Sequence, residues 1–174
     1  MFTRVTDFLT DYREEAREAQ KNWDALTDES LQQRAGEGLM SIGEQLWHVA
    51  SIWQYVFIDE LKLWPGEKFS EKPPETAAGL ADFYREAAEK ATGWIEQNWG
   101  DDDLAAELEL WGMKMTHGKL LWELIKHEAH HRGQIVTLMR LAGLPVHGIY
   151  GPSKEEAAAM QQAAEQQSSP NGAG

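Results

Sequence analysis

The sequence has 174 residues, a formal net charge of −13, 42% hydrophobic residues and 26% charged residues. These values are typical of one globular domain, which buries about 70% of the surface that its unfolded chain exposes. The negative charge argues against nucleic acid and anionic lipid as partners, because both require lysine and arginine to neutralise phosphate. Cysteine is absent, which excludes disulfides, thiolate metal ligands and a cysteine nucleophile.

The N-terminal segment and the apolar runs indicate the compartment. The segment MFTRVTDFLTDYREE becomes acidic before a signal-peptide core could develop. Every apolar run is shorter than the ~20 residues of a membrane span. We therefore expect a cytoplasmic protein with no membrane partner.

Apolar residues at steps of three and four predict four long amphipathic helices. The first three are expected over about residues 2–24, 42–63 and 75–99. The fourth is expected to have Thr116 as its N-cap and to end at Gly143. A capping box, Ser41-Ile42-Gly43-Glu44, marks the start of the second helix.

The segment ELELWGMKMTHG is the one place with alternating polar and apolar residues. Leu108 and Leu110 would face Met113 and Met115, which predicts a short hairpin between helices three and four. The fold class is therefore all-α, a four-helix bundle with a short hairpin. The periodicity leaves the order of the helices around the bundle open.

The chain divides by composition into two parts. Residues 1–151 form the predicted bundle domain, and residues 152–174 form a polar tail rich in alanine, glutamine and glutamate. The tail has no apolar stripe with which to pack on the bundle, so we expect it to be partly helical and disordered at its end.

The apolar stripe of the fourth helix contains two histidines. It continues through Leu124, His127, His131 and Ile135. Side chains four residues apart lie one above the other on a helix, about 6 Å apart at Cβ. Buried polar rings are costly without a partner. A shared metal ion explains both histidines, and the alternative is that they are packing residues with ordinary hydrogen bonds.

A stable site needs a third ligand, and the sequence offers four other histidines. His117 lies on the same helix about 15 Å from His127, which is too far to share the ion. His130 points to the flank of that helix, and His147 lies beyond its end. His48 is the best candidate because it lies beside the core stripe of another long helix. Three histidines suit Zn²⁺, Ni²⁺, Fe²⁺ or Mn²⁺ and leave a coordination position open, as in catalytic sites.

Three segments resemble the DinB family: SIGEQLWHVASIW, THGKLLWELIKHEAHHRGQIVTLMRLAGLP and the trailing IYG. The resemblance covers about residues 1–151. It implies a four-helix bundle whose histidine triad holds a divalent metal ion, Ni²⁺ or Zn²⁺ before Fe²⁺ or Mn²⁺. By motif position the metal ligands are His48, His127 and His131, with no departure from the family pattern.

Other residues near these motifs have weaker assignments. Gln134 would make a hydrogen bond near the triad or between helices, and Glu44 has its capping role. Tyr55 would pack in the core or reach a pocket. Trp47 and Trp122 would line a pocket mouth.

Characterised relatives of this family include transferases and isomerases that use a low-molecular-weight thiol such as mycothiol or bacillithiol. The resemblance therefore implies a metal-dependent transferase that joins such a thiol to a small electrophile. One alternative is a metal-dependent hydrolase with Glu128 or another carboxylate as base. The other is a non-catalytic, stress-induced metal-binding bundle. The expected partners are a small-molecule substrate and a second copy in a homodimer, and the catalytic and thiol-binding residues stay unassigned.

Overall fold

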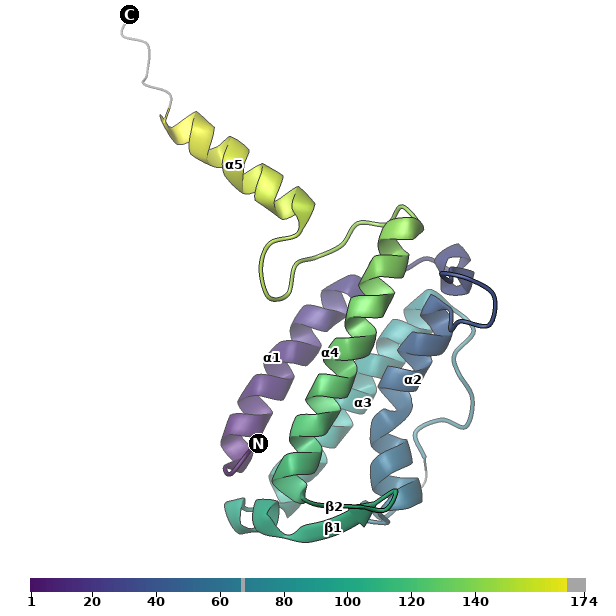
Figure 1. Cartoon of the computed structure of the whole chain (residues 1–174), viewed down its shortest axis with the longest axis vertical. Coiled ribbons are helices and arrows are strands. Elements are labelled where there is room, and N and C mark those ends of the chain that lie inside the picture. Colours follow the sequence, from purple (N-terminus) through teal and green to yellow (C-terminus); the bar gives the residue numbers. More distant parts are fainter. Residues whose placement is uncertain (67, 169–174) are drawn as a thin grey trace, which may run out of the picture.

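Four long helices and a small hairpin make up most of the chain (Figure 1). The computed structural model describes residues 1–66 and 68–168. The long helices are α1 (Val5–Trp23), α2 (Ile42–Gln54), α3 (Ala77–Asn98) and α4 (His117–Leu141). The shorter elements are η1 (Glu29–Gln32), the π-helical turn η2 (Tyr55–Glu60), η3 (Asp101–Ala105), β1 (Glu107–Leu110), β2 (Met113–Thr116) and α5 (Lys154–Ser168). The all-α bundle predicted from the sequence is confirmed.

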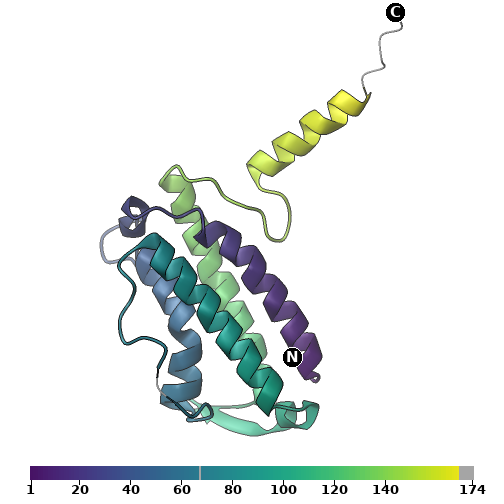
Figure 2. The same ribbon diagram turned by 180° about the vertical axis from the view of Figure 1, so that it is seen from behind.

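The helices follow one another around the bundle in the order α1, α3, α2, α4. Helix α2 packs against α3 and α4, and α1 packs against the same two helices. Figures 1 and 2 show α1 and α4 running in one direction and α2 and α3 in the other. The connection between the parallel helices α2 and α3 therefore returns along the whole length of the bundle. This arrangement places α2 and α4 side by side, as the triad requires.

Side-chain caps explain where three of the helices begin. The capping box of α2 is formed, since Ser41 Oγ accepts from the Glu44 amide and Glu44 accepts from the Ser41 amide. Thr76 and Thr116 cap α3 and α4 in the same manner, each accepting from the amide three residues on. Each cap satisfies backbone donors that the first helical turn leaves unpaired.

The hairpin expected from the alternating segment is present. Strands β1 and β2 are antiparallel, with Leu108 opposite Met115 and Leu110 opposite Met113. Figure 1 shows the hairpin lying across the end of the bundle where α4 begins and α2 ends. An isolated hairpin is only marginally stable, and this one gains stability because Leu110 is buried in the core of the bundle.

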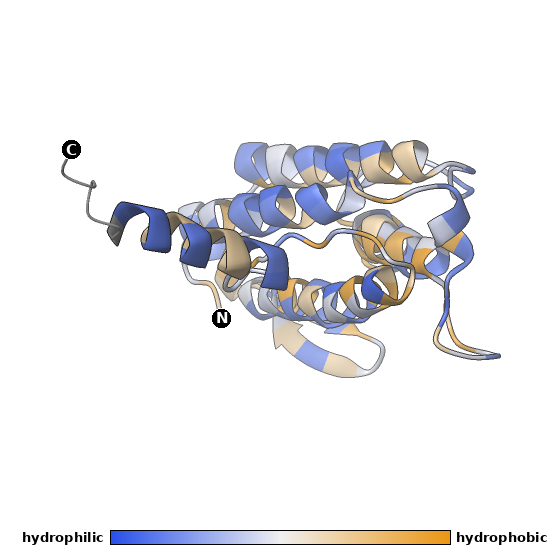
Figure 3. Cartoon of the chain, turned by 90° about the horizontal axis from the view of Figure 1, so that it is seen from above, coloured by the Kyte–Doolittle hydropathy of each residue, from blue (hydrophilic) through white to orange (hydrophobic). Residues whose placement is uncertain are grey.

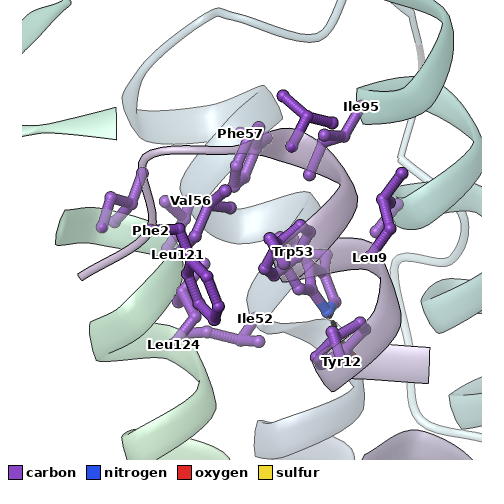
Figure 4. Packing of buried hydrophobic residues seen from close by; sticks show 14 of the residues in the cluster. Phe2, Leu9, Tyr12, Ile52, Trp53, Val56, Phe57, Ile95, Leu121 and Leu124 are labelled. Atoms are coloured by element: carbon purple, nitrogen blue, oxygen red, sulfur yellow. Dashed lines mark hydrogen bonds between the residues drawn. The ribbon is translucent and has the colours of Figure 1, made fainter. Parts of the chain in front are cut away.

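The core consists of two apolar clusters, one in each half of the bundle. The cluster nearer the hairpin includes Phe8, Trp53, Phe57 and Leu121, and Figure 4 shows its side chains interlocking between the helices. The indole Nε1 of Trp53 donates to Tyr12 Oη over 2.7 Å. Truncating one of these buried aromatic side chains to alanine would cost about 3–5 kcal/mol. The second cluster surrounds Trp23, Leu46, Leu80 and Ile135.

A polar layer crosses α4 between the two clusters. Leu124 belongs to the first cluster and Ile135 to the second. His127, Glu128, His131 and Arg132 lie between them on the same helix. The histidines face α2, and Glu128 faces Tyr84 on α3. In the middle of the bundle, α4 therefore carries the histidines on the side that faces α2 and Glu128 on the side that faces α3.

Helix α5 lies away from the bundle (Figure 1). The side chains of residues 157–167 are exposed, and Figure 3 shows a largely hydrophilic helix. An ion pair between Arg140 and Glu155 connects its first turn to the end of α4. Helical structure in the tail agrees with the sequence, whereas the predicted disorder falls on residues 169–174, outside the described residues. The boundary at residue 151 stays a prediction.

Candidate metal centre

His48, His127 and His131 come together between α2 and α4. The Nε2 atoms of His48 and His127 lie 3.0 Å apart. One ring nitrogen from each of the three histidines lies within 4.8 Å of the others. The three ring centroids are 4.6–4.9 Å apart and no two rings are parallel. The rings therefore converge on one point instead of stacking.

The distance between His48 and His127 fits two ligands of one divalent ion. Zn–N bonds of about 2.0–2.1 Å place two imidazole nitrogens on one tetrahedral ion about 3.3 Å apart. The observed 3.0 Å between His48 and His127 is within a few tenths of an ångström of this value. His127 Nδ1 is buried and has no hydrogen-bond partner among the described residues. The three residues could thus hold a metal ion, with His127 using Nε2.

The surroundings keep the rings neutral near pH 7. Burial lowers the pKa of His48, and burial with the charge of neighbouring histidines lowers the pKa of His131. For His127, burial is the largest cause, followed by the charges of the neighbouring histidines, and its pKa falls to about 4. A neutral imidazole keeps the lone pair that a metal ion needs. The three imidazole rings are therefore already deprotonated at neutral pH, as metal ligands must be.

Gln45 holds the ring of His131. Its Oε1 lies 3.4 Å from His131 Nδ1, and its Nε2 donates to the Met40 carbonyl. An amide oxygen can only accept, so Nδ1 of His131 carries the hydrogen and Nε2 has the free lone pair. The carboxamide is buried one turn before His48. The sequence places Gln45 beside His48, but its contact with His131 depends on the packing of α2 against α4.

A large cavity borders the triad. It has a volume of about 1400 Å³ and reaches His48 and His127 at one side. Its walls come from helices α2 and α4, the turn η2, the hairpin and the connector before α3. Most of the lining area is apolar, and Ile52, Leu120 and Leu124 contribute to it. Typical small-molecule sites have volumes of about 300–1,000 Å³. The cavity is therefore large enough to admit a small molecule to the histidines.

The other histidines lie outside the triad, as the sequence predicts. His117 stacks on Trp99 with centroids 4.5 Å apart, at the start of α4. His130 is exposed and pairs with Gln134 at 2.8 Å. The backbone amide of His147 donates to Asn22. His130 is consequently a control for substitutions in the triad, because it adjoins His131 in sequence.

The weaker sequence assignments have mixed outcomes. Trp47 and Tyr55 line the cavity, so Tyr55 reaches the pocket. Trp122 lies off the cavity and contacts Phe2, which makes its predicted place at the pocket mouth wrong. Gln134 lies on the exposed face, where it pairs with His130 and also acts on His131, which agrees with the predicted hydrogen bond near the triad.

Glu128, the carboxylate considered as a hydrolytic base, faces the interior between α1 and α3. Tyr84 donates a hydrogen bond to it. Burial raises its pKa, while the bond from Tyr84 and the charge of Arg132 act in the opposite direction. Arg132 pairs with Glu15 at 2.7 Å. This buried group ties α4 to α1 and α3, away from the cavity.

The fold and the site together define a four-helix bundle with a three-histidine site between two neighbouring helices. A model described as the DinB family matches residues 1–168, including α5. The protein named YrdA from Bacillus subtilis is 39% identical over 158 residues, which cover 90% of this chain and 93% of YrdA. The chain belongs to the DinB family.

Two solved structures agree with this fold. A DinB-like protein from Bacillus cereus superposes with a TM-score of 0.78 at 33% identity, covering 86% of this chain and 100% of the other. The DinB-like protein YjoA from Bacillus subtilis has a TM-score of 0.64 at 18% identity, covering 84% and 99%. At that identity the second likeness concerns the fold alone. Within residues 1–66 and 68–168, every helix is too short or too polar to cross a membrane.

Proposed function

We propose that the chain binds a divalent metal ion through His48, His127 and His131 and acts as a transferase that joins a low-molecular-weight thiol to a small electrophile. The observation that supports this most is the convergence of three neutral imidazoles beside an apolar cavity of about 1400 Å³. The sulfur must come from a small molecule, because the chain has no cysteine.

The residues of the chain would prepare the site in three ways. His48, His127 and His131 would hold the ion, and Gln45 would fix the tautomer of His131. The apolar side chains beside His48 and His127, such as Ile52 and Leu124, would lower the local dielectric constant, which strengthens electrostatic interactions there. A bound divalent ion supplies a Lewis acid that lowers the pKa of a thiol sulfur. Ni²⁺ and Zn²⁺ are the first candidates, followed by Fe²⁺ and Mn²⁺.

The carboxylates near the cavity favour the transferase over the hydrolase. Among the described residues that line it, the acidic ones are Asp59, Glu71 and Glu123. Lys68 pairs with Asp59 and Glu71. Hydrogen bonds from Lys119 and Lys126 lower the pKa of Glu123, which makes it a weaker base. A hydrolase would need one of these groups, or Glu128 on its buried side, as the general base.

Metal analysis tests the first part of the proposal. The protein is purified without a histidine tag, and its metal content is measured for the wild type and for His131→Ala and His130→Ala. We expect one divalent ion per chain in the wild type and in the exposed control, and a large loss in His131→Ala. A wild type without stoichiometric metal would overturn the triad assignment.

Thiol consumption tests the second part. The metal-loaded protein is incubated with mycothiol, bacillithiol or glutathione and with monochlorobimane as electrophile. We expect conjugation that depends on both protein and metal with at least one thiol. Stoichiometric metal without conjugation would contradict the transferase and leave the hydrolase and the non-catalytic bundle. The homodimer, the small-molecule substrate, the absence of nucleic-acid and membrane partners and the cytoplasmic location stay predictions.

A further inference from the structure

Two exposed aromatic rings lie together at the mouth of the cavity. Tyr55 and Trp111 stack with ring centroids 6.3 Å apart and an interplanar angle of 27°. Tyr55 is 43% exposed and Trp111 is 58% exposed. Both line the cavity that reaches His48 and His127. Two exposed aromatic rings in contact form an apolar patch at the cavity mouth, and such patches often mark binding sites.

The backbone at Trp111 is strained. Trp111 and Gly112 are the two residues of the hairpin turn and have φ values of 51° and 76°. A two-residue turn of this kind needs positive φ at both positions and favours Asn-Gly or Asp-Gly. A bulky side chain at positive φ is costly. The hairpin therefore keeps tryptophan at a position where asparagine would be more stable.

The backbone at Tyr55 is also irregular. Helix α2 widens there into the π-helical turn η2, in which the Leu61 amide bonds the Val56 carbonyl five residues earlier. Single π-helical turns are rare and occur often at functional sites. Two unusual backbone conformations, on elements far apart in sequence, thus present the two rings that stack.

We propose that Tyr55 and Trp111 bind a flat apolar group, an aromatic or heteroaromatic ring, of the small molecule that enters the cavity. The inference rests on the proposed function only in identifying that molecule as the substrate. The chemistry of the mouth agrees with such a ring, because Met113 and Met115 of the hairpin line the same cavity and methionine sulfur contacts aromatic rings favourably. Stacking on an aromatic side chain accepts any flat ring.

The strain at Trp111 distinguishes a binding role from a structural one. If Trp111 serves the stability of the hairpin, replacing it with asparagine removes its packing on Tyr55 and lowers Tm. If Trp111 serves a ligand, Trp111→Asn relieves the strained turn and raises Tm by about 2–4 °C. The same variant then binds flat rings more weakly.

Calorimetric titration with naphthol tests the ring site directly. The saturated analogue decahydronaphthol controls for hydrophobicity, and the variants are Tyr55→Leu, Trp111→Leu, Trp111→Phe and Trp122→Leu. Trp122 is an exposed tryptophan that lies off the cavity, against Phe2. We expect naphthol to bind the wild type more tightly than decahydronaphthol does. The affinity for naphthol should fall about two- to tenfold in Tyr55→Leu and Trp111→Leu, fall less in Trp111→Phe, and stay unchanged in the control Trp122→Leu.

The outcomes separate this proposal from the proposed function. Failure of naphthol to bind the wild type, equal binding of both alcohols, or unchanged binding in Trp111→Leu would overturn the ring site. A change in oligomeric mass in Trp111→Leu with unchanged naphthol affinity would assign the pair to an interface and also overturn it. Loss of metal in His131→Ala with retained naphthol binding supports both proposals, whereas a metal-free wild type that binds naphthol overturns the metal site alone.

Discussion

Gln45 on α2 and His131 on α4 are joined by a hydrogen bond of 3.4 Å across the helix interface. His131 is a predicted metal ligand on α4. Gln45, which holds its ring, lies on α2, the helix that also carries the predicted ligand His48. Such partners fix both the tautomer and the orientation of a ligating histidine. The relationship leads to a prediction about metal affinity.

Replacing Gln45 with leucine should weaken metal binding about 10–100-fold, because the ring of His131 loses its acceptor. Gln45→Glu keeps an acceptor and should retain most of the affinity. Competition titration against a chromophoric chelator measures the difference. Gln97→Leu is the matched control, since Gln97 is exposed on α3. Equal affinities for Gln45→Leu and Gln97→Leu would contradict a positioning role.

The metal-free protein should lose stability as the pH falls from about 6.5 toward 4. The pKa of His127 is lowered to about 4 in the folded state, whereas it is about 6.5 in the unfolded chain. Between these values the unfolded state binds more protons, so protonation favours unfolding. Urea denaturation after chelation, at pH 7 and pH 5, measures the loss. The variant His127→Asn should lose less free energy of unfolding between pH 7 and pH 5 than the wild type does. An equal loss in both proteins would contradict the assignment of the effect to His127.

Tyr84→Phe should lower the free energy of unfolding by about 1–3 kcal/mol, because the buried Glu128 loses the hydrogen bond from Tyr84 and keeps only its weaker interaction with Tyr12. Tyr55→Phe is the same chemical change at a residue that is 43% exposed and lies outside this buried group, and water can replace its hydroxyl. Comparable losses in both variants, measured by urea denaturation, would contradict this account.

Two glycines of α4 should respond in opposite directions to alanine. A Cβ at Gly118 would overlap the carbonyl oxygen of Phe2, whereas a Cβ at Gly133 meets open space. Gly118→Ala should therefore cost about 1–3 kcal/mol by displacing the N-terminal segment. Gly133→Ala should stabilise the helix by up to about 1 kcal/mol. Thermal unfolding of both variants checks the contrast, and a shift of the same sign in both would contradict it.

Much of the fold follows from local patterns in the sequence. The capping box at Ser41 and the apolar spacing predict the start of α2, because both are set within a few residues. The end of α2 differs from the expected continuous helix over 42–63, since Tyr55–Glu60 form a π-helical turn. That turn packs Val56 and Phe57 into the core, and no local pattern distinguishes it from an α-helix.

The sequence by itself determined that His127 and His131 lie on one face of one helix, because a spacing of four residues fixes their directions wherever the helix packs. It also determined that any sulfur nucleophile must come from outside the chain. Only the tertiary structure decided that His48 meets this pair, that Gln45 holds His131, and that Tyr55 and Trp111 stack at the mouth of the cavity. These contacts join α2 to α4 and to the hairpin, and periodicity leaves such pairings undetermined, because the order of helices in a bundle depends on how all their apolar faces pack together.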